Sequence, residues 1–462
     1  MSKDSTLDDF IEDKKEKSSN LKLGPIEIDI PDEWDSKELT SVLDLTTGNN
    51  YSGKHLSDND NGGRIFLTLK SVNKGGGFNW DSLKYYTGEV NDKEIVEPGD
   101  LLIANTDVTQ DGDIVGYSIR VPDFNSKKEI AASMDLSILR PKCDSINIPY
   151  VEYLLQTNYV HSRMRAFSAG STVLHLNTDL VKSLSLPFPP LPEQRKIATI
   201  LHSVDQAIEK TEKIIEQAER TKQALMQSLF VDGYFEHGET VTAHHQNRLP
   251  RHPAEWQTKP AEDVMEVTRG AHPRPKSDDS LWRGETPIVK IGDRNRGDSR
   301  TITTTKEKVT EKGSQKSKLV DEGTLIVSNA GTVGVARITG MQTCIHDHWL
   351  ILRDYEEDLS TRYLYYFINW NQEFLEALAS GSTVLDLNTD DFRLFDVTFP
   401  PLDEQQKIAD SLDSLHDQKM ANIQYSEQLK RLKQGLMQDL LSGTVRTTDT
   451  NIQVPDEIEQ YG

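Results

Sequence analysis

Residues 170–198 read GSTVLHLNTDLVKSLSLPFPPLPEQRKIA, and residues 381–409 read GSTVLDLNTDDFRLFDVTFPPLDEQQKIA. The similarity extends downstream, where QALMQSLF at 223–230 matches QGLMQDLL at 434–441. The offset is 211 residues in both places, from 170 to 381 and from 223 to 434. Such agreement indicates an internal duplication. Two copies are too few for a solenoid of stacked repeats, so the sequence predicts two related domains, each followed by one long helix.

A long helix is predicted after each FPPL motif. Proline fixes φ and lacks an N–H, so the helix begins after the motif, and the acidic Glu193 and Glu404 suit the positive end of a helix. The apolar residues that follow form a stripe made of Ile197, Leu201, Val204, Ile208, Ile215 and Leu225 in the first helix and Ile408, Leu412, Leu415, Leu429 and Leu436 in the second. These stripes predict an antiparallel coiled coil with approximate two-fold symmetry. The alternative is that each helix folds back on its own domain.

Short alternating or β-branched segments dominate residues 35–160 and 257–378. Segments such as GDLLIANT and DLSILR in the first region, and GTLIVSNAG and HWLILR in the second, are bounded by turn-forming residues and predict strands. One helix is expected to follow in each region, at 151–164 and at 361–378, because apolar residues recur there at a spacing near 3.6. The sequence therefore predicts an α+β fold with two repeated domains, each a twisted antiparallel sheet plus short helices.

The ends of the chain are polar, and they complete the predicted domain organisation. The N-terminus carries charges where a signal peptide needs an apolar run, and no apolar run is long enough to span a membrane. A cytoplasmic protein without membrane contact is therefore expected. The predicted segments are a disordered polar tail at 1–20, a first domain at 21–190, a long helix at 191–232, a linker at 233–250, a second domain at 251–401, a second long helix at 402–443 and an acidic tail at 444–462.

The chain of 462 residues has a formal net charge of −22, which by itself disfavours contacts with nucleic-acid phosphates. The charge is uneven, however, because residues 288–318 hold nine Lys or Arg against four Asp or Glu. An acidic protein with a local basic face is compatible with DNA binding, with a solvated charged loop, or with a salt-rich cell. The two cysteines, Cys143 and Cys344, form neither a zinc spacing nor a disulfide framework.

The sequence lacks the common motifs of catalysis. It contains no G-x-x-x-x-G-K-[ST] phosphate loop and no Gly-rich cofactor loop between a strand and a helix. His346 and His348 alternate on a predicted strand and are compatible with a metal pair, but two structural histidines are the preferred interpretation. No catalytic residue, metal site or bound cofactor is therefore predicted for this chain.

The repeated motifs G-S-T-x-x-x-L-N and F-P-P-L-x-E-Q-x-K-I-A, each followed by a long helix, resemble the specificity subunit of type I restriction-modification systems. Pro187–Ala198 and Thr398–Ala409 carry the most diagnostic residues, and the resemblance covers nearly the whole chain. It implies a non-catalytic subunit in which each domain is a target recognition domain for one half of a bipartite, asymmetric DNA sequence. It also implies that the helices set the spacer and dock two methyltransferase subunits, which methylate adenine, and that restriction subunits complete the complex. S-adenosylmethionine, ATP and Mg²⁺ would bind to those partner subunits.

DNA contacts are expected from loops and sheet edges of the recognition domains, because Lys and Arg suit phosphates or guanine and Asn suits adenine. The candidates in the first domain are Lys70, Asn73, Lys74, Asn105, Thr106, Arg163 and Arg165. The candidates in the second domain are Lys290, Arg294, Asn295, Arg296, Ser328, Asn329 and Thr332. The repeated pairs Ser171-Thr172 and Ser382-Thr383 are compatible with phosphate contacts, although turn or capping roles are preferred for them.

Three alternatives stay open on the sequence alone. The same DNA-reading role is compatible with a modification-only or other phage-defence assembly, because the partner subunits decide that outcome. A stand-alone DNA methyltransferase or nuclease is disfavoured by the missing cofactor and phosphate loops, and binding of S-adenosylmethionine by the pure chain would support it. A coiled-coil adaptor unrelated to DNA would ignore DNA even with a methyltransferase present.

Overall fold

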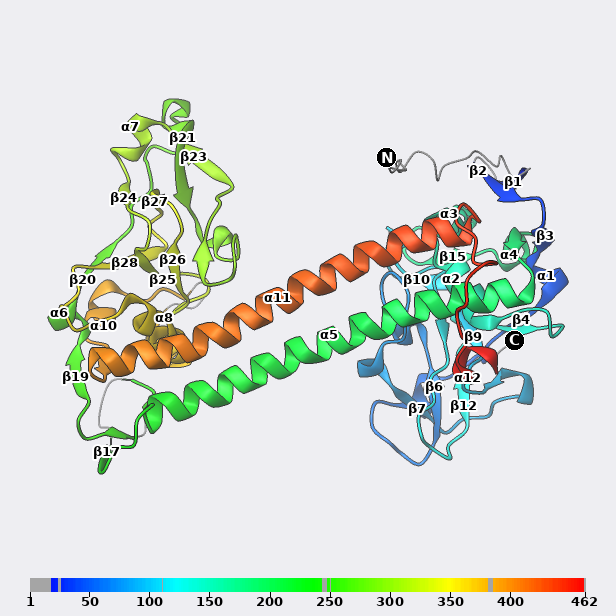
Figure 1. Ribbon diagram of the computed structural model, residues 1–462, viewed down its shortest axis with the longest axis horizontal. Helices are drawn as coiled ribbons and strands as arrows, with labels where there is room; N and C mark the ends of the chain where they lie inside the picture. The colour runs from blue at the N-terminus through cyan, green and yellow to red at the C-terminus, as the bar shows by residue number, and fades with distance from the viewer. Residues whose placement is uncertain are drawn as a thin grey trace, which may run out of the picture. The chain divides into compact units, whose positions relative to one another are not determined.

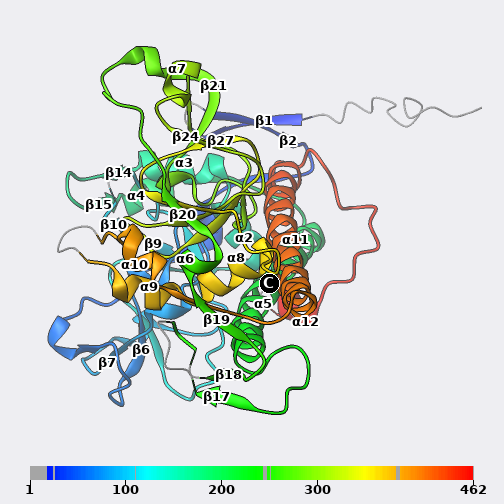
Figure 2. The same cartoon turned by 90° about the vertical axis from the view of Figure 1, so that its left-hand side faces the viewer.

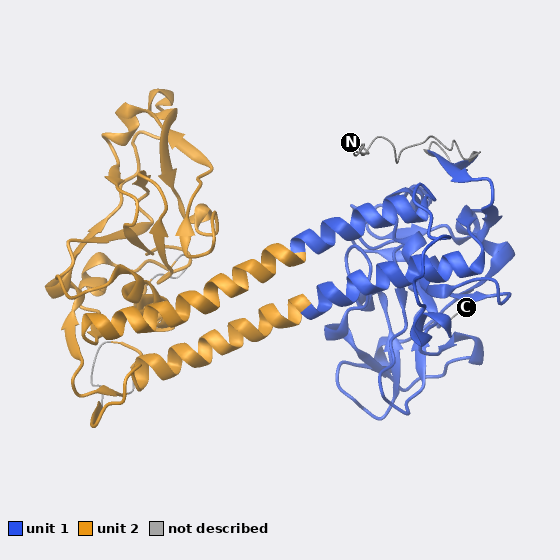
Figure 3. Ribbon diagram, in the orientation of Figure 1, with its two compact units in different colours: residues 1–210, 427–462 blue, residues 211–426 orange. Residues whose placement is uncertain are grey.

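The computed structural model of the chain describes residues 18–23, 26–109, 111–242, 247–249, 251–380 and 385–460. The chain forms two compact units. Unit 1 comprises Met1–Lys210 together with Glu427–Gly462, and unit 2 comprises Thr211–Ser426. Each unit holds one of the two repeated domains and part of each long helix, as Figure 3 shows.

Two long helices, α5 (Leu191–Val231) and α11 (Leu402–Leu441), follow the FPPL motifs (Figure 1). Within unit 1, Lys433 Nζ lies 2.7 Å from Asp205 Oδ1, and within unit 2, Lys419 Nζ lies 2.6 Å from Glu219 Oε2. In both pairs the residue numbers add up to 638, so the two contacts belong to one antiparallel register. The prediction that the long helices pack together in opposite directions is confirmed.

The apolar stripe of each long helix packs against the domains at its two ends and against the other long helix in its middle. In unit 1, Ile197 and Leu201 are fully buried in the domain core, and Ile408 and Leu412 are buried equally in unit 2. Nearer the middle, Ile208 and Leu429 are buried, and Val204, Ile215 and Leu415 are half-buried. Half-buried Leu225 and Leu436 lie near the C-terminal ends of the helices and pack against the domain cores. The helix ends therefore pack on the domains, as the alternative interpretation held, while the middles pack on each other.

Unit 1 contains two packed sheets and a layer of helices. The first sheet has the order β11 (Ser118–Arg120), β9 (Leu101–Ala104), β13 (Leu136–Pro141), β4 (Leu43–Thr47). The second has the order β5 (Leu56–Ser57), β7 (Lys84–Tyr86), β6 (Arg64–Leu67), β12 (Ile130–Ala132), β8 (Ile95–Val96), and the helices are α2 (Ile148–Leu155) and α3 (Asn158–Ala166). Successive residues of a strand point to opposite faces. Ile103 of β9 accordingly joins the core with the helices, and Leu102 joins the core with the second sheet.

Unit 2 repeats this arrangement. Its first sheet has the order β20 (Glu266–Arg269), β28 (Trp349–Arg353), β25 (Leu325–Ser328), β26 (Ala336–Thr339), β22 (Thr301–Ile302). Its second has the order β23 (Glu307–Val309), β21 (Trp282–Val289), β27 (Thr343–Ile345), β24 (Lys318–Val320). Val327 of β25 packs in the core with α8 (Thr361–Trp370), and Ile326 packs in the core with the second sheet. Figures 1 and 2 show β21 and α7 (Glu311–Ser314) at the end of this unit away from α8 and α10 (Thr389–Arg393).

The α+β class is confirmed, and the structure differs from the prediction in two details. Each domain has two sheets, and each second sheet contains a parallel pair, β6 with β12 and β21 with β27. Each predicted single helix is broken in two. Thr157 is extended (φ −64°, ψ 146°) between α2 and α3, and buried Asn371 separates α8 from α9 (Gln372–Leu378). The Asn371 side chain donates locally to Phe367 O and accepts from Arg248 N, and the bond from Arg248 is a tertiary contact that periodicity does not reveal.

The remaining strands and helices connect these layers. In unit 1 they are β1 (Ser18–Leu23), β2 (Ile26–Pro31), β3 (Asp35–Glu38), α1 (Leu39–Val42), β10 (Thr106–Asp107), β14 (Ser168–Ala169), β15 (Leu174–Leu176), α4 (Thr178–Lys182), β16 (Ser185–Phe188) and α12 (Asp456–Glu459). In unit 2 they are β17 (Thr240–Thr242), β18 (Arg251–Pro253), β19 (Gln257–Pro260), α6 (Ala261–Val264) and β29 (Asp396–Phe399). No helix among the described residues is long and apolar enough to cross a membrane.

The two polar ends of the chain are partly built into the fold. Residues 1–17 of the predicted N-terminal tail lie outside the described residues, and β1 already begins at Ser18. In the C-terminal segment predicted as an acidic tail, Ile458 is fully buried and its carbonyl accepts a hydrogen bond from Asn147 Nδ2 at 2.8 Å. This segment therefore belongs to the core of unit 1.

Candidate nucleic-acid interface

The Glu-Gln pair of the repeated F-P-P-L-x-E-Q motif connects the start of each long helix to its domain. Gln194 Oε1 accepts from Asn147 N at the start of α2, and Gln405 Oε1 accepts from Ser360 N at the start of α8, both at 2.9 Å. The Nε2 of each glutamine donates to a proline carbonyl just before the helix, Pro189 or Pro400. A fully buried amide with these partners explains why the same residue recurs at the same place.

The glutamate of each pair holds the segment that follows the other long helix. Glu193, at the start of α5, accepts hydrogen bonds from Arg446 and Thr447, which follow α11. Glu404, at the start of α11, accepts from Tyr234 N at 2.7 Å and from His237 Nε2 at 2.9 Å, which follow α5. The glutamate of the repeated F-P-P-L-x-E-Q motif therefore acts as a clamp, once in each unit, between the start of one long helix and the segment that follows the other.

The repeated G-S-T segment docks on the loop that follows the central strand of each domain. Asn105 O, after β9, accepts from Leu176 N at 2.7 Å, and Asn329 O, after β25, accepts from Leu387 N at 2.7 Å. Ser171 and Thr172 are exposed in a bend of this segment. The equivalent pair, Ser382-Thr383, lies outside the described residues.

Four of the predicted DNA contacts are buried in these strand-end loops. Ser137 Oγ donates to Asn105 Oδ1, and Thr106 Oγ1 donates to Asp135 Oδ1. In unit 2, Ser328 Oγ accepts from Val335 N, and Asn329 Nδ2 donates to Asp386 Oδ1. Each of the four residues is 9% exposed or less, so these side chains hold the loops in place and do not form part of an exposed surface.

The other candidates cluster on two equivalent loops. In unit 1, β6 leads into a short 3-10 helix, η3 (Leu69–Ser71), and in unit 2, β21 leads into η7 (Ile291–Asp293). Each turn is capped in the same way, because the backbone N–H before it donates to the side chain of its last residue, Ser71 or Asp293. Lys70, Asn73 and Lys74 therefore occupy the same place in the fold as the segment from Lys290 to Arg296. We call these the first recognition loop, residues 68–79, and the second recognition loop, residues 290–303.

In unit 1 the structure brings Lys74 and Arg165 together around one neighbouring loop. Lys74 Nζ lies 2.7 Å from Asp113 Oδ2, and the side chain of Arg165 packs against the backbone of Gly112. Lys70, Asn73 and Arg165 are exposed, while Arg163 is half-buried with its guanidinium 4.6 Å from the Phe167 ring. The first recognition loop and the C-terminal end of α3 thus lie beside the same loop, and their exposed side chains are accessible to solvent.

In unit 2 the candidates from Lys290 to Arg296 lie on one loop, and Arg337 holds the backbone of this loop in place. Arg337 Nε donates to Arg294 O at 2.7 Å, and Arg296 Nε lies 2.8 Å from Asp293 Oδ1. Asn295 and Arg296 are exposed, although Asn295 Oδ1 also accepts a hydrogen bond from Arg337 Nη2 at 3.4 Å. Lys290 is half-buried and paired with Glu307, and Thr332 lies apart, on the loop between β25 and β26.

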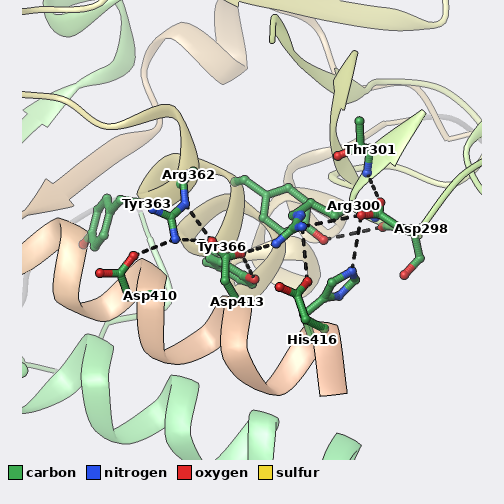
Figure 4. Close-up of polar contacts among 12 residues, drawn as sticks. Asp298, Arg300, Thr301, Arg362, Tyr363, Tyr366, Asp410, Asp413 and His416 are labelled. Carbon is green, nitrogen blue, oxygen red and sulfur yellow. Dashed lines mark hydrogen bonds and ion pairs between the residues drawn. The ribbon is translucent and has the colours of Figure 1, made fainter. Parts of the chain in front are cut away.

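An ion-pair network that the sequence did not suggest fastens the second recognition loop to α11 (Figure 4). Arg300, near the end of the loop, pairs with Asp413 and lies 3.3 Å from Asp417. Asp413 also accepts from Arg362 Nε at 2.6 Å and from Tyr366 Oη at 2.6 Å. Burial alone would raise the pKa of Asp413, but the hydrogen bonds from Tyr366 and Arg362 and the charge of Arg300 lower the pKa below its ordinary value. Asp413 is therefore a permanent anion that anchors the loop.

Two domains with equivalent loops of different sequence, built on paired antiparallel helices, define a two-domain recognition scaffold. The chain belongs to the type I restriction-modification DNA specificity domain family, because the family model matches residues 31–220 and again residues 253–432. Members are specificity subunits without catalytic activity of their own, so the predictions of a DNA specificity subunit and of a non-enzyme are confirmed.

Individual relatives agree with this assignment. The chain is 24% identical over 430 residues to the putative type I restriction enzyme MjaX specificity subunit of Methanocaldococcus jannaschii, covering 90% of this chain and 95% of that protein. It is 22% identical over 435 residues to the MjaIX specificity subunit of the same organism, covering 91% and 95%. Its fold is similar to the crystal structure of a type I restriction-modification S subunit from M. genitalium, with a TM-score of 0.55, 15% identity and coverage of 91% and 98%.

Proposed function

We propose that the two recognition domains each read one half of a bipartite, asymmetric DNA sequence. The observation that carries this proposal is the equivalence of the two recognition loops. They follow equivalent strands and begin with equivalent capped 3-10 turns, yet one reads TLKSVNKGGGFN and the other KIGDRNRGDSRTIT. Two loops that lie at equivalent positions but carry different side chains suit two different half-sites that face the protein in the same way.

The exposed side chains of these loops supply the chemistry. Asn73 and Asn295 suit the N6 and N7 atoms of adenine, and Arg296 suits guanine or a phosphate. Lys70, Lys74 and Arg165 suit the phosphate backbone, which fixes orientation without reading sequence. These groups are local exceptions in a chain of net charge −22, so binding to DNA is expected to depend on partner subunits that add positive charge.

The paired helices are proposed to set the number of unread base pairs between the half-sites and to dock two methyltransferase subunits. The shared antiparallel register supports a fixed length. Ile214 and Tyr425 of unit 2 leave about half of their side chains exposed, at 46% and 51%, and their residue numbers place them at the same level of the helix pair. We infer that this pair of exposed apolar side chains at one level contacts a partner protein.

Restriction subunits are proposed to complete the complex, with S-adenosylmethionine, ATP and Mg²⁺ bound by the partners. The test is to replace residues 251–401 by the second recognition domain of a relative with a different target and to co-express the chimera with the methyltransferase subunit. One half of the methylated motif should change while the other half and the spacer stay. A change in both halves, or in neither, contradicts the proposal.

A further inference from the structure

Three neighbouring residues in unit 2 place metal-ligand atoms close together. His346, Asp347 and His348 form the turn between β27 and β28, and one ligand atom from each lies within 4.8 Å of the others. His346 Nδ1 is 2.7 Å from Asp347 Oδ1, and the same oxygen is 4.0 Å from His348 Nε2. The His346 and His348 rings have centroids 4.7 Å apart at an angle of 71°, so the rings do not stack.

A fourth candidate ligand comes from a distant part of the sequence. His272, in the loop that follows β20, is only 7% exposed, and its ring centroid is 4.5 Å from that of His346. Among the described residues, neither nitrogen of the His272 ring has a hydrogen-bond partner, although both are buried. Buried polar atoms nearly always have a partner, so two such atoms on one imidazole indicate a missing ligand.

The donor atoms of the cluster suit a metal, because His272 offers a buried ring nitrogen and Asp347 offers a carboxylate oxygen beside His346. Arg274 Nη2 lies 3.3 Å from Asp347 Oδ2, which leaves Oδ1 facing the histidines. Three imidazoles and one carboxylate match the donor set of a four-coordinate zinc site.

We propose that His272, His346, Asp347 and His348 bind one divalent transition-metal ion, with zinc as the expected ion, in a closed structural site. Imidazole nitrogen favours such an ion over Mg²⁺ or Ca²⁺, which prefer oxygen. The ion would link the loop after β20 to the β27–β28 turn.

This position gives the ion a consequence for the recognition loop. His346 N donates to Val289 O at 3.1 Å, and Val289 is the last residue of β21 before the second recognition loop. A metal at this turn would stiffen the base of that loop. The proposed site does not depend on the proposed half-site reading, because the chain can hold the ion in the absence of DNA.

The test uses the full chain without a polyhistidine tag. After incubation with Zn²⁺ and gel filtration, elemental analysis should find about one zinc per chain. Co²⁺ added to metal-free chain should give the visible d–d absorption of tetrahedral nitrogen and oxygen coordination, and chelation should lower the melting temperature.

Two variants make the result specific. His348→Ala removes a side chain that is 47% exposed, so it should leave the fold intact, while His175→Ala removes an exposed histidine in unit 1. Loss of a mere hydrogen-bond partner of a ligand costs about 10- to 100-fold in metal affinity, so His348→Ala should cost at least as much. His175→Ala should bind zinc like the wild type. Wild-type chain without stoichiometric zinc, or equal zinc affinity in wild type and His348→Ala, would overturn the proposal.

Discussion

The carboxylate of Glu193 receives two hydrogen bonds from the guanidinium of Arg446, at 2.9 Å from Nε and 3.0 Å from Nη2. The two residues are 253 positions apart, and Glu193 also accepts from Trp34 Nε1 at 3.2 Å. The Glu193 side chain is only 3% exposed, so this fork joins the start of α5 to the segment that follows α11. Unit 1 is thereby closed by residues from three separate parts of the chain.

Glu193→Gln should release the C-terminal segment of unit 1. The substitution removes the buried one of the two carboxylates that pair with half-buried Arg446, the other being Glu33, so we expect the free energy of local opening of residues 442–460 to fall by about 2–4 kcal/mol. Native-state hydrogen exchange measured by mass spectrometry reports this opening. Glu216→Gln, on the same helix but with a side chain that is 66% exposed, is the control and should leave protection of this segment unchanged.

The matching clamp in unit 2 should depend on pH. Burial lowers the pKa of His237, but the hydrogen bonds and charges of Glu404 and Glu255 outweigh it, so the pKa is raised above the ordinary 6.5. A group with a raised pKa in the folded state contributes its full stability below its unfolded pKa and loses it as the pH rises through the folded value. Protection of residues 232–242 against hydrogen exchange, corrected for intrinsic rates, should therefore decrease as the pH rises from 6 towards 9. His237→Gln should remove this dependence, and a wild-type profile that is flat or rises would contradict the assignment.

Asp413→Asn should loosen the second recognition loop. Arg300, Arg362 and Tyr366 all bond to this carboxylate, whose side chain is 14% exposed, so loss of its charge should destabilise residues 298–303 by about 2–3 kcal/mol. Hydrogen exchange of that segment provides the measurement. Asp410→Asn is the matched control, because Asp410 is 58% exposed and, among the described residues, pairs with Arg362 alone, so its effect should stay below about 1 kcal/mol. Equal effects of the two substitutions would argue against the anchor.

Lys70→Gln should weaken DNA binding without changing the sequence that is read. A lysine that contacts a phosphate releases about one counterion, so its loss should reduce the slope of log K against log salt by about one. Fluorescence anisotropy with the methyltransferase complex and a target duplex, over a range of salt concentrations, measures this slope. Lys54→Gln changes an exposed lysine of the same domain outside the loop and should leave the slope as it is. A slope unchanged by Lys70→Gln would remove this residue from the interface.

The elements that depend on local sequence were predictable. FPPL cannot continue a helix, and residues 193–230 after the first motif lack Gly and Pro, so the starts of α5 and α11 followed from proline chemistry and periodicity. The duplication predicted that the two helices pair, because each apolar stripe needs to be covered and the two stripes can cover each other. The helix breaks at Thr157 and Asn371 were not predictable, because the apolar period continues through both residues.

The candidate site was predictable only in part, because burial of polar residues is a tertiary property. Asn105 and Asn329 follow strands and look like exposed loop residues, yet each lies under a repeated segment about 60 to 70 positions later, where Leu176 and Leu387 dock. Arg300 was noted only as one of many basic residues, since its partner Asp413 is 113 positions away. Proximity of this kind leaves no periodic trace in the sequence.

We propose that the helix pair sets the spacer between the two half-sites. Residues 212–218 of α5 face residues 420–426 of α11 in the register defined by the ion pairs, so both segments can be deleted without disturbing the remaining pairs. The deletion removes seven residues from each helix, which at about 1.5 Å per residue is about 10 Å, or about three base pairs at 3.4 Å each.

The decisive measurement is direct sequencing of N6-methyladenine in the DNA of cells that express this chain with its methyltransferase subunit. We expect a split motif that is methylated on both strands and is lost without this chain. In the double-deletion variant its spacer should be shorter by about three base pairs, with both half-sites unchanged. Methylation that persists without the chain, or altered half-sites in the variant, would contradict the proposal.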